Sequence, residues 1–238
     1  MELLPFTGTA EQHIARLYES VGRNRLDNHR LRQRVSGLEA AKAIGSSRPI
    51  DFRAQFAEDS VIWELLDGQT TGFFIEAGAF NGYDLSVTYA LEAIGWTGLL
   101  VEPIPERAAE CKARRPGSRV VNAALSSTIG TASFRVSDDQ YGGMLSAIGD
   151  APESIQVPMT TLDALLADHV RPIDAVIIDV EGSELDVLRG FNLQRFRPRI
   201  LIVEDNTRGK NTALDEHMAD QPYRLLTWCE MNRVYTLT

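Results

Sequence analysis

Short apolar runs alternate with helical patterns over most of the chain. Runs of this kind are typical of strands buried on both faces of a parallel sheet, and the helical stretches between them would cover those faces. The runs lie at residues 73–76, 99–102, 120–125, 173–180 and 199–203, and the helical patterns lie at residues 52–66, 83–94, 105–115, 161–169 and 212–218. The alternation predicts an α/β fold with a doubly wound, mostly parallel sheet.

Two segments at the end of the chain predict strands of another kind. Residues 223–228 and 232–237 are separated by a short turn, so they predict an antiparallel C-terminal pair. A shorter alternating segment at residues 133–136 predicts the edge strand of a hairpin. Residues 138–149 have no clear periodicity and predict a loop, which is where substrate contacts are often found.

The first 50 residues differ from the rest of the chain. Residues 11–43 contain no proline and predict a long helix. Counting three and four residues alternately along it gives a mostly apolar seam: Ile14, Leu17, Val21, Asn24, Asn28, Leu31, Val35 and Leu38. Such a seam can pair helices, and a buried Asn can fix the register and the number of partners. The sequence leaves two possibilities open: a homo-oligomer formed through this helix, or a helix that packs on the rest of the chain.

A linker with Gly, Ser and Pro at residues 45–49 ends this region, so we expect an N-terminal helical arm with its linker at 1–50 and a second domain at 51–238. The net charge of −9 and the lack of a basic tract argue against nucleic acid as the main partner. No apolar run is long enough for a membrane span, and no signal peptide is evident, so we expect a cytoplasmic protein. The two cysteines, Cys111 and Cys229, fit neither a disulfide framework nor a zinc site.

Residues 73–82 carry the most chemical information. The predicted strand there ends at Glu76, and the turn that follows contains Gly78 and Gly82. Glycine allows a positive φ and lets a ligand approach the backbone, and a helix that begins after such a turn can bind a nucleotide-type ligand. The spacing E-x-G-x-x-x-G differs from the G-x-G-x-x-G of dinucleotide enzymes and is typical of S-adenosylmethionine-dependent methyltransferases. An ordinary tight turn between a strand and a helix is the alternative.

Acidic residues also end the later strands. Glu102 ends the next strand, where an acidic residue commonly binds the ribose hydroxyls of a nucleotide. Asp179, Glu204 and Asp205 end two further strands, and crowded carboxylates raise one another's pKa unless a cation is present. Hard oxygen ligands without a Cys or His cluster suit Mg²⁺, so these three residues are the predicted metal ligands. The predicted cofactor site consists of Glu76, Gly78, Ala79, Gly82, Ser86, Glu102 and Asn122.

Several of these stretches resemble the FkbM family of methyltransferases. The similar segments are GFFIEAGAFNG at residues 72–82, SVTYALE at 86–92, GWTGLLVEP at 95–103, TLD at 161–163 and IDVEGSEL at 178–185. Residues 55–59 are also similar to the stretch that often precedes the first strand in this family. The resemblance covers about residues 52–238 and excludes the arm. It implies a Rossmann-like fold, S-adenosylmethionine as the methyl donor, and a small-molecule or carbohydrate acceptor whose hydroxyl is methylated, as in sugars, glycans and secondary metabolites.

The resemblance also implies a catalytic arrangement. Some members are similar in holding Mg²⁺ with acids that match Asp179, Glu204 and Asp205, and in using as base a His soon after the strand-end Asp. Here the corresponding turn is EGS at residues 181–183, with no His. Glu181 is the candidate base, because a metal-bound hydroxyl has a lowered pKa and needs only a weak base. The alternative is that Glu181 is an acidic residue favoured in the first turn of a helix. Asp179 and Glu181 are the candidate catalytic residues.

Two other functional classes remain open at this point. A nucleotide-dependent oxidoreductase would share the strand–turn–helix pattern, but the glycine spacing disfavours it. A non-catalytic nucleotide-binding or scaffolding module would use the arm more than the cleft, and the intact set of strand-end acids argues against it.

Overall fold

A seven-stranded sheet forms the centre of the computed structural model, which describes residues 10–137, 147–149 and 154–238, with side chains from residue 25 onward. The strands are β1 (Phe73–Ala77), β2 (Thr97–Glu102), β3 (Arg119–Asn122), β8 (Ala175–Ile178), β9 (Ile200–Glu204), β10 (Tyr223–Cys229) and β11 (Asn232–Leu237). Their order in the sheet is β10-β11-β9-β8-β1-β2-β3. Strands β3, β2, β1, β8 and β9 are parallel, and β11 runs antiparallel to β9 and β10. The predicted doubly wound α/β fold and its antiparallel C-terminal pair are confirmed.

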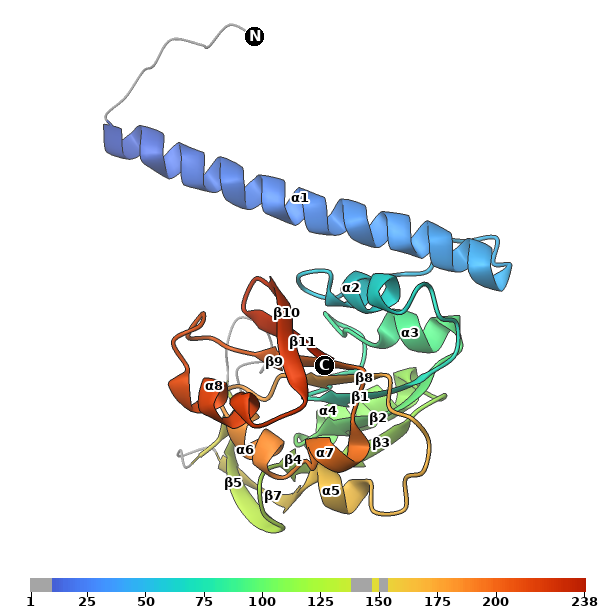
Figure 1. Ribbon diagram of the computed structural model, residues 1–238, viewed down its shortest axis with the longest axis vertical. Helices are drawn as coiled ribbons and strands as arrows, with labels where there is room; N and C mark the ends of the chain where they lie inside the picture. The colour runs from blue at the N-terminus through green and yellow to red at the C-terminus, as the bar shows by residue number, and fades with distance from the viewer. Residues whose placement is uncertain (1–9, 138–146, 150–153) are drawn as a thin grey trace, which may run out of the picture.

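Helices lie on both faces of this sheet (Figure 1), and the apolar side chains of its strands alternate between the two helical layers. Ile75 on β1 packs in the cluster that includes side chains of α5 (Leu162–Leu165), α6 (Glu184–Arg189), α7 (Leu193–Phe196) and α8 (Thr212–Ala219). Phe74 packs on the opposite face, in the cluster that includes side chains of α2 (Glu58–Leu65), α3 (Tyr89–Ile94) and α4 (Pro105–Arg114). Because successive residues of a strand point to opposite faces, the continuous apolar run in β1 covers both layers.

A second sheet of four strands was not predicted. It consists of β4 (Ala124–Leu125), β7 (Ser154–Thr160), β5 (Gly130–Arg135) and β6 (Ala147–Ile148), in the order β4-β7-β5-β6. The expected single strand at 120–125 is therefore two strands in different sheets, separated at Ala123, whose amide donates to the carbonyl of Glu102. A change from one sheet to another within an apolar run cannot be predicted from the sequence when the run contains neither Gly nor Pro. Most of the expected loop at 138–149 lies outside the described residues.

Side-chain hydrogen bonds make two predicted helices shorter. The helix expected at 83–94 begins only at Tyr89, because the backbone amide of Val87 and the hydroxyls of Ser86 and Thr88 donate to Glu76 instead. Similarly, the helix expected at 52–66 begins only at Glu58, where the preceding backbone amides donate to Asp59. The helix expected at 161–169 ends at Leu165, but its predicted cap is confirmed by the bond from the amide of Ala164 to Thr161 Oγ1.

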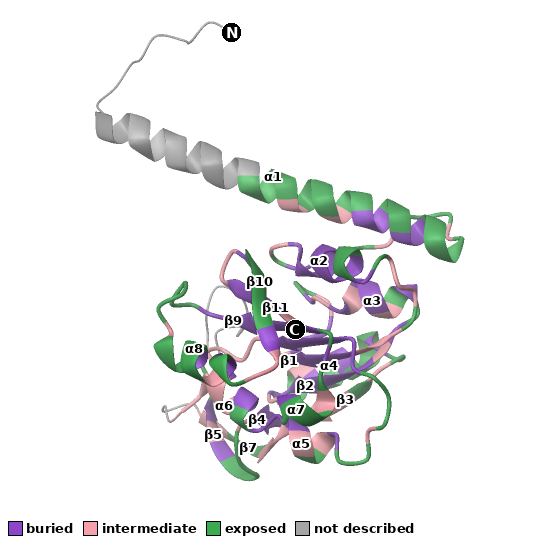
Figure 2. Cartoon of the chain, viewed as in Figure 1, coloured by how far each residue is buried: buried purple, intermediate pink, exposed green. Residues whose placement is uncertain are grey.

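The long N-terminal helix is confirmed as α1 (Ala10–Ile44), which lies across α2 and α3 and extends beyond them (Figure 1). Small residues face the body: Ser36, Gly37 and Ala40 are buried, and a Cβ at Gly37 would lie 2.3 Å from the carbonyl oxygen of Ile50. Among the described side chains, the predicted apolar seam lies on the exposed part of α1, which is green in Figure 2. No described helix is both long and apolar enough to cross a lipid bilayer.

Candidate functional site

A cavity of about 520 Å³ opens at the carboxyl ends of β1, β2, β8 and β9. Ligands of open α/β sheets bind at this end of the strands. Most of the predicted site residues line the cavity: Glu76, Gly78, Ala79, Ser86, Glu102, Asp179, Glu181 and Glu204. Gly82, Asn122 and Asp205 do not line it.

Glu76 at the end of β1 shapes one wall of the cavity. Its buried carboxylate accepts hydrogen bonds from Ser86 Oγ at 3.0 Å, from the amide of Val87 at 2.9 Å and from Thr88 Oγ1 at 2.5 Å. The guanidinium of the fully buried Arg115 lies 3.7 Å away and also donates to Ser86 and Thr88. Glu76 therefore binds the segment after the glycine turn, and this network holds Ser86 in place.

Glu102 at the end of β2 holds the turn from the neighbouring strand. Its two carboxylate oxygens accept hydrogen bonds from the backbone amides of Phe80 and Ile104, each at 2.9 Å. Burial raises the pKa of Glu102 to about 7, although both amides and the charge of Arg107 favour the ionised form. A carboxylate has more acceptor sites than these two amides occupy, so Glu102 can still accept from a ligand in the cavity.

Packing requires both glycines of the turn that follows β1. Gly78 has φ +83°, and a Cβ there would lie 1.7 Å from the backbone carbonyl oxygen of Asp179. Gly82 has φ +72°, and a Cβ there would lie 2.7 Å from Cys111 Sγ on α4. Close approach of β1 to the end of β8 thus depends on Gly78, while Gly82 positions the turn against α4. Gly82 was predicted to belong to the cofactor site, but in the structure it does not line the cavity.

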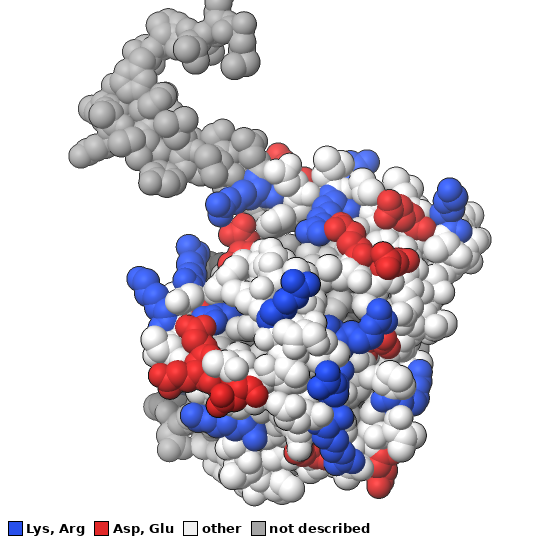
Figure 3. Space-filling view, in the orientation of Figure 1, with Lys and Arg blue, Asp and Glu red and all other residues white. Residues whose placement is uncertain are grey.

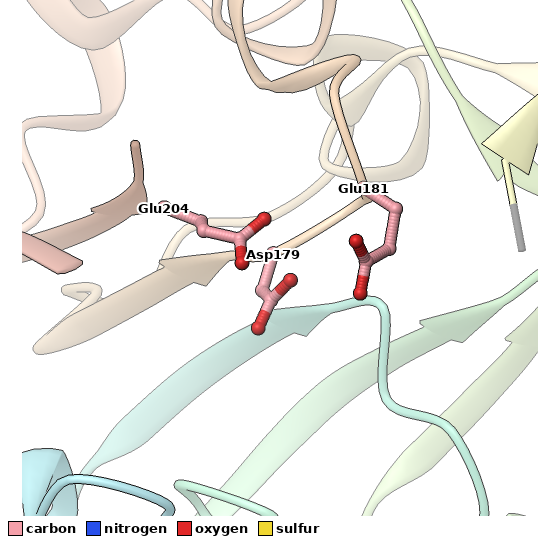
Figure 4. Close-up of side chains that lie close together, drawn as sticks. All are labelled: Asp179, Glu181 and Glu204. Carbon is pink, nitrogen blue, oxygen red and sulfur yellow. The ribbon is translucent and has the colours of Figure 1, made fainter. Parts of the chain in front are cut away.

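Three carboxylates lie close together on the β8 and β9 side of the cavity (Figure 4). Asp179 follows β8, Glu181 belongs to the next turn and Glu204 ends β9, and each offers an oxygen within 4.8 Å of the others. Burial, followed by the neighbouring negative charges, raises the pKa of Asp179 and of Glu204. Glu204 Oε2 is buried and has no hydrogen-bond partner among the described residues. An unsatisfied buried oxygen within a carboxylate cluster fits a hard divalent cation.

The turn after β8 aims Glu181 into the cluster. Glu181 adopts a left-handed conformation with φ +57°, and Gly182 follows with φ +101°. The buried side chain of Glu184 accepts from the amide of Gly182 at 2.8 Å and from the amide of Val180 at 3.2 Å. Glu184 therefore holds this uncommon backbone in place, and Glu181 lies beside Asp179 rather than along the following helix (Figure 4).

Asp205 has a different role from the one predicted. Its carboxylate accepts from Thr207 Oγ1 at 2.6 Å, from the amide of Gly209 at 2.9 Å and from Arg233 Nε at 2.8 Å. Burial raises its pKa, but these hydrogen bonds outweigh burial and lower the pKa of Asp205. Adjacent residues of an extended chain point in opposite directions, so Asp205 leaves the cluster that Glu204 joins. The structure brings Glu181, not Asp205, to Asp179 and Glu204.

Asn122 also lies outside the cavity. Its side-chain amide donates to the carbonyl oxygens of Glu102 at 2.9 Å and Pro103 at 2.8 Å, and the residue is exposed. Asn122 therefore stabilises the chain after β2 and contacts the backbone of Glu102, which lines the cavity.

Other polar residues line the cavity without having been predicted as site residues. They include Gln55, Glu58, Asn206 and Asn232. Asn232 Nδ2 donates to Glu58 Oε1 at 2.6 Å, and burial raises the pKa of Glu58 to about 7. The resemblance at residues 55–59 was a sequence signal for Gln55 and Glu58. Asn232 had none, because only the insertion of β11 beside β9 brings it to the cavity.

The cavity is strongly acidic. Its described lining residues include no Lys, Arg or His, and the acidic ones are Glu58, Glu76, Asp84, Glu102, Asp179, Glu181 and Glu204. The face drawn in Figure 3 instead shows acidic and basic side chains interspersed. A cleft lined by one sign of charge favours ligands of the opposite sign or neutral ligands.

Comparison with known proteins adds a family match. The family model described as Methyltransferase FkbM domain matches residues 76–225, and no curated protein matches. Similar solved structures include precorrin-6Y C5,15-methyltransferase from Geobacter metallireducens, at 14% identity over 76% of this chain and 86% of that chain, with a TM-score of 0.43. A putative RNA methyltransferase from Pyrococcus horikoshii has 9% identity over 86% of this chain and 99% of that chain, with a TM-score of 0.45. The family match includes the strand ends from β1 to β9 but excludes α1, Glu58 and Asn232.

Proposed function

This chain belongs to the FkbM family of S-adenosylmethionine-dependent methyltransferases, and we propose that it methylates a hydroxyl oxygen of a sugar, glycan or secondary metabolite with help from a divalent metal ion such as Mg²⁺. The observation that carries this proposal is the cluster of Asp179, Glu181 and Glu204 at the cavity. We take residues 51–238 as the methyltransferase domain and 1–50 as an arm, because the cavity is lined from Gln55 onward.

The donor would be held on the β1 and β2 side of the cavity. Gly78 and Ala79 present backbone there, and Glu102 is the acceptor for the ribose hydroxyls. Glu76 acts indirectly, because its hydrogen bonds hold Ser86 and the rest of the cavity wall. S-adenosylmethionine, when bound, supplies a methyl group on a positively charged sulfonium, and the acidic cavity suits that charge.

Asp179 and Glu204 would hold the metal ion, which would lower the pKa of an acceptor hydroxyl and orient it. Glu181 is then the candidate base that accepts the hydroxyl proton on a carboxylate oxygen. The acceptor oxygen would then bond to the methyl carbon as the carbon–sulfur bond breaks, and the electron pair of that bond would stay on sulfur. The left-handed turn at Glu181, held by Glu184, supports this role because it directs the carboxylate to the cluster.

The lining of the cavity favours an uncharged acceptor. Phosphate and carboxylate groups are usually bound by Arg, Lys or helix N-termini, and the described lining residues contain none of the basic side chains. Gln55, Asn206 and Asn232 carry amides that can both donate to and accept from hydroxyl groups. These features support a hydroxyl-rich acceptor and argue against a nucleic acid.

A screen of acceptors with methyl-labelled S-adenosylmethionine, with Mg²⁺ and with excess chelator, tests the proposal. We expect label on the oxygen of a neutral hydroxyl compound, a lower rate in chelator and little transfer by Glu181→Gln. Label found only on carbon or nitrogen would contradict the proposed O-methylation. Equal rates of methyl transfer with Mg²⁺ and with excess chelator would contradict the proposed role of the metal ion.

A further inference from the structure

Helix α1 has two opposite faces, and its own domain covers only one. On that face Ser36, Gly37 and Ala40 are buried, and Gln33 Nε2 donates to the carbonyl oxygen of Ala54 at 2.8 Å. Trp63 Nε1 on α2 donates to Glu39 at the edge of the same face. These contacts fix the rotation of α1 about its axis, and therefore decide which side chains face outward.

The outward face carries the apolar seam. Leu31, Val35 and Leu38 are 59%, 48% and 60% exposed, and Asn28 is exposed one turn before them. The interval between these residues is alternately three and four, so they form one stripe along the helix. The stripe lies opposite Ser36, Gly37 and Ala40, because these occupy the b, c and f positions when the stripe occupies a and d. Ala41, which is also buried, occupies g at the edge of the covered face.

We propose that this stripe binds the same stripe of a second copy of the chain, in a parallel two-stranded coiled coil. In the sequence, the a positions are Ile14, Val21, Asn28 and Val35, and the d positions are Leu17, Asn24, Leu31 and Leu38. β-branched residues at a with Leu at d favour parallel dimers, and Asn at an a position selects register and partner number at some cost in stability.

The charges beside the stripe match this arrangement. In a parallel pair, a g residue faces the e residue five positions later on the other helix. Arg34 at g would face Glu39 at e of the second copy, and Asp27 would face Arg32 in the same way. Neither Asp27 nor Arg34 makes a salt bridge with a described residue of its own chain. Arg32 already forms a salt bridge with Glu64, whereas Glu39 accepts a hydrogen bond from Trp63 Nε1 but forms no salt bridge with a described residue, so the Arg34–Glu39 pair is the more informative one.

Pairing through this stripe leaves each cavity complete. None of the described residues that line the cavity belongs to α1. The inference is therefore independent of the proposed methyl acceptor and metal, and it can be tested on the purified full chain without any substrate.

Sedimentation equilibrium of the full chain measures the pairing. We expect wild type to have twice the 26.4 kDa mass of one chain. Val35→Glu places a charge in the stripe, and should weaken pairing about 100-fold. The matched control is Val170→Glu, at an apolar position that is 93% exposed and lies outside α1, and it should leave the dimer intact. A wild type that sediments as one chain would overturn the inference, whether or not it binds lipid vesicles. A Val35→Glu variant that is still fully dimeric would also overturn it.

A charge swap tests the parallel orientation. Arg34→Glu should weaken pairing about tenfold by replacing two attractions with two repulsions, and adding Glu39→Arg should restore it. Arg30→Glu changes an exposed residue away from the stripe on the same helix and should have little effect. Failure of the double variant to recover, or an equal effect of Arg30→Glu, would overturn the parallel arrangement.

Discussion

The carboxylates of Asp179 and Glu204 lie together because they follow neighbouring parallel strands in matched register. Ile178 on β8 pairs with Val203 on β9, so the next residue of each strand emerges at the same edge of the sheet. Burial is the main cause that raises the pKa of each. The charge of Glu184 adds to it for Asp179, and the charge of Asp179 adds to it for Glu204. Two like charges held this closely are unfavourable without a cation, so metal binding and protein stability should be coupled here.

Glu102 should make cofactor binding dependent on pH. Burial raises its pKa to about 7, and hydroxyl donors of the cofactor favour the ionised carboxylate, so binding should release a proton below that pH. We expect the affinity for S-adenosylhomocysteine to increase as the pH rises towards about 7. Glu102→Gln should weaken binding by about 1–3 kcal/mol and lose this dependence. Calorimetric titrations from about pH 6 to about pH 8, one unit on either side of neutrality, would measure both effects.

Glu106→Gln is the matched control for Glu102, because Glu106 is an exposed carboxylate on the adjacent helix α4. It should bind like wild type at every pH. A Glu102→Gln variant with unchanged affinity and the wild-type pH profile would show that Glu102 does not contact the cofactor.

Arg115 should be essential for the cavity wall after β1. Its buried guanidinium donates to Glu92 at 3.0 Å, to Ser86 and to Thr88, and lies near Glu76. Arg115→Met would leave two enclosed carboxylates without their counter-charge, and should lower the free energy of unfolding by about 3–5 kcal/mol. Urea denaturation followed by circular dichroism measures this loss. The exposed Lys112→Met on the same helix should change stability little, and a similar small change for Arg115→Met would refute the role.

Glu58 should make the protein less stable as the pH rises. Its pKa is about 7 in the folded chain because of burial, against 4.5 as the ordinary value, so the folded state binds a proton between these pH values that the unfolded state releases. The free energy of unfolding should therefore fall by up to about 3 kcal/mol through this window from Glu58 alone. Glu58→Gln should flatten the fall, whereas the exposed Glu216→Gln should keep the wild-type slope. Equal slopes in all three proteins would contradict this account.

The acids at the strand ends could be predicted from the sequence because the alternation of apolar runs and helices implies parallel strands. The carboxyl ends of parallel strands lie at the same edge of the sheet. Glu76, Glu102, Asp179 and Glu204 all lie at one cavity as that pattern requires. The alternation of side chains along an extended strand indicates that Asp205 and Glu204 point in opposite directions, so the sequence could have separated them. The partner of Asp205 could not be predicted, since Arg233 follows it by a whole helix and strand.

Long-range pairing explains the other gaps. The chain passes from the large sheet to the small one at Ala123, where neither Gly nor Pro marks the change, and β4 then pairs with the distant β7. Asn232 meets Glu58 only because β11 inserts beside β9. In α1 the heptad spacing was visible in the sequence, but the face that packs on the body was not. Gly37 and Ala40 form that face because only small side chains allow the helix to approach so closely.

The most direct test of the central claim is the titration of Mg²⁺ into the protein by calorimetry, with bound S-adenosylhomocysteine, for wild type, Glu204→Gln and the exposed control Glu216→Gln. Glu204→Gln keeps the shape of the side chain but removes one ligand charge. We predict one Mg²⁺ site in wild type and in the control, and binding weakened at least about tenfold in Glu204→Gln. A wild type without a Mg²⁺ site, or a Glu204→Gln variant that binds Mg²⁺ as tightly as wild type, would contradict the claim that this carboxylate cluster holds the metal.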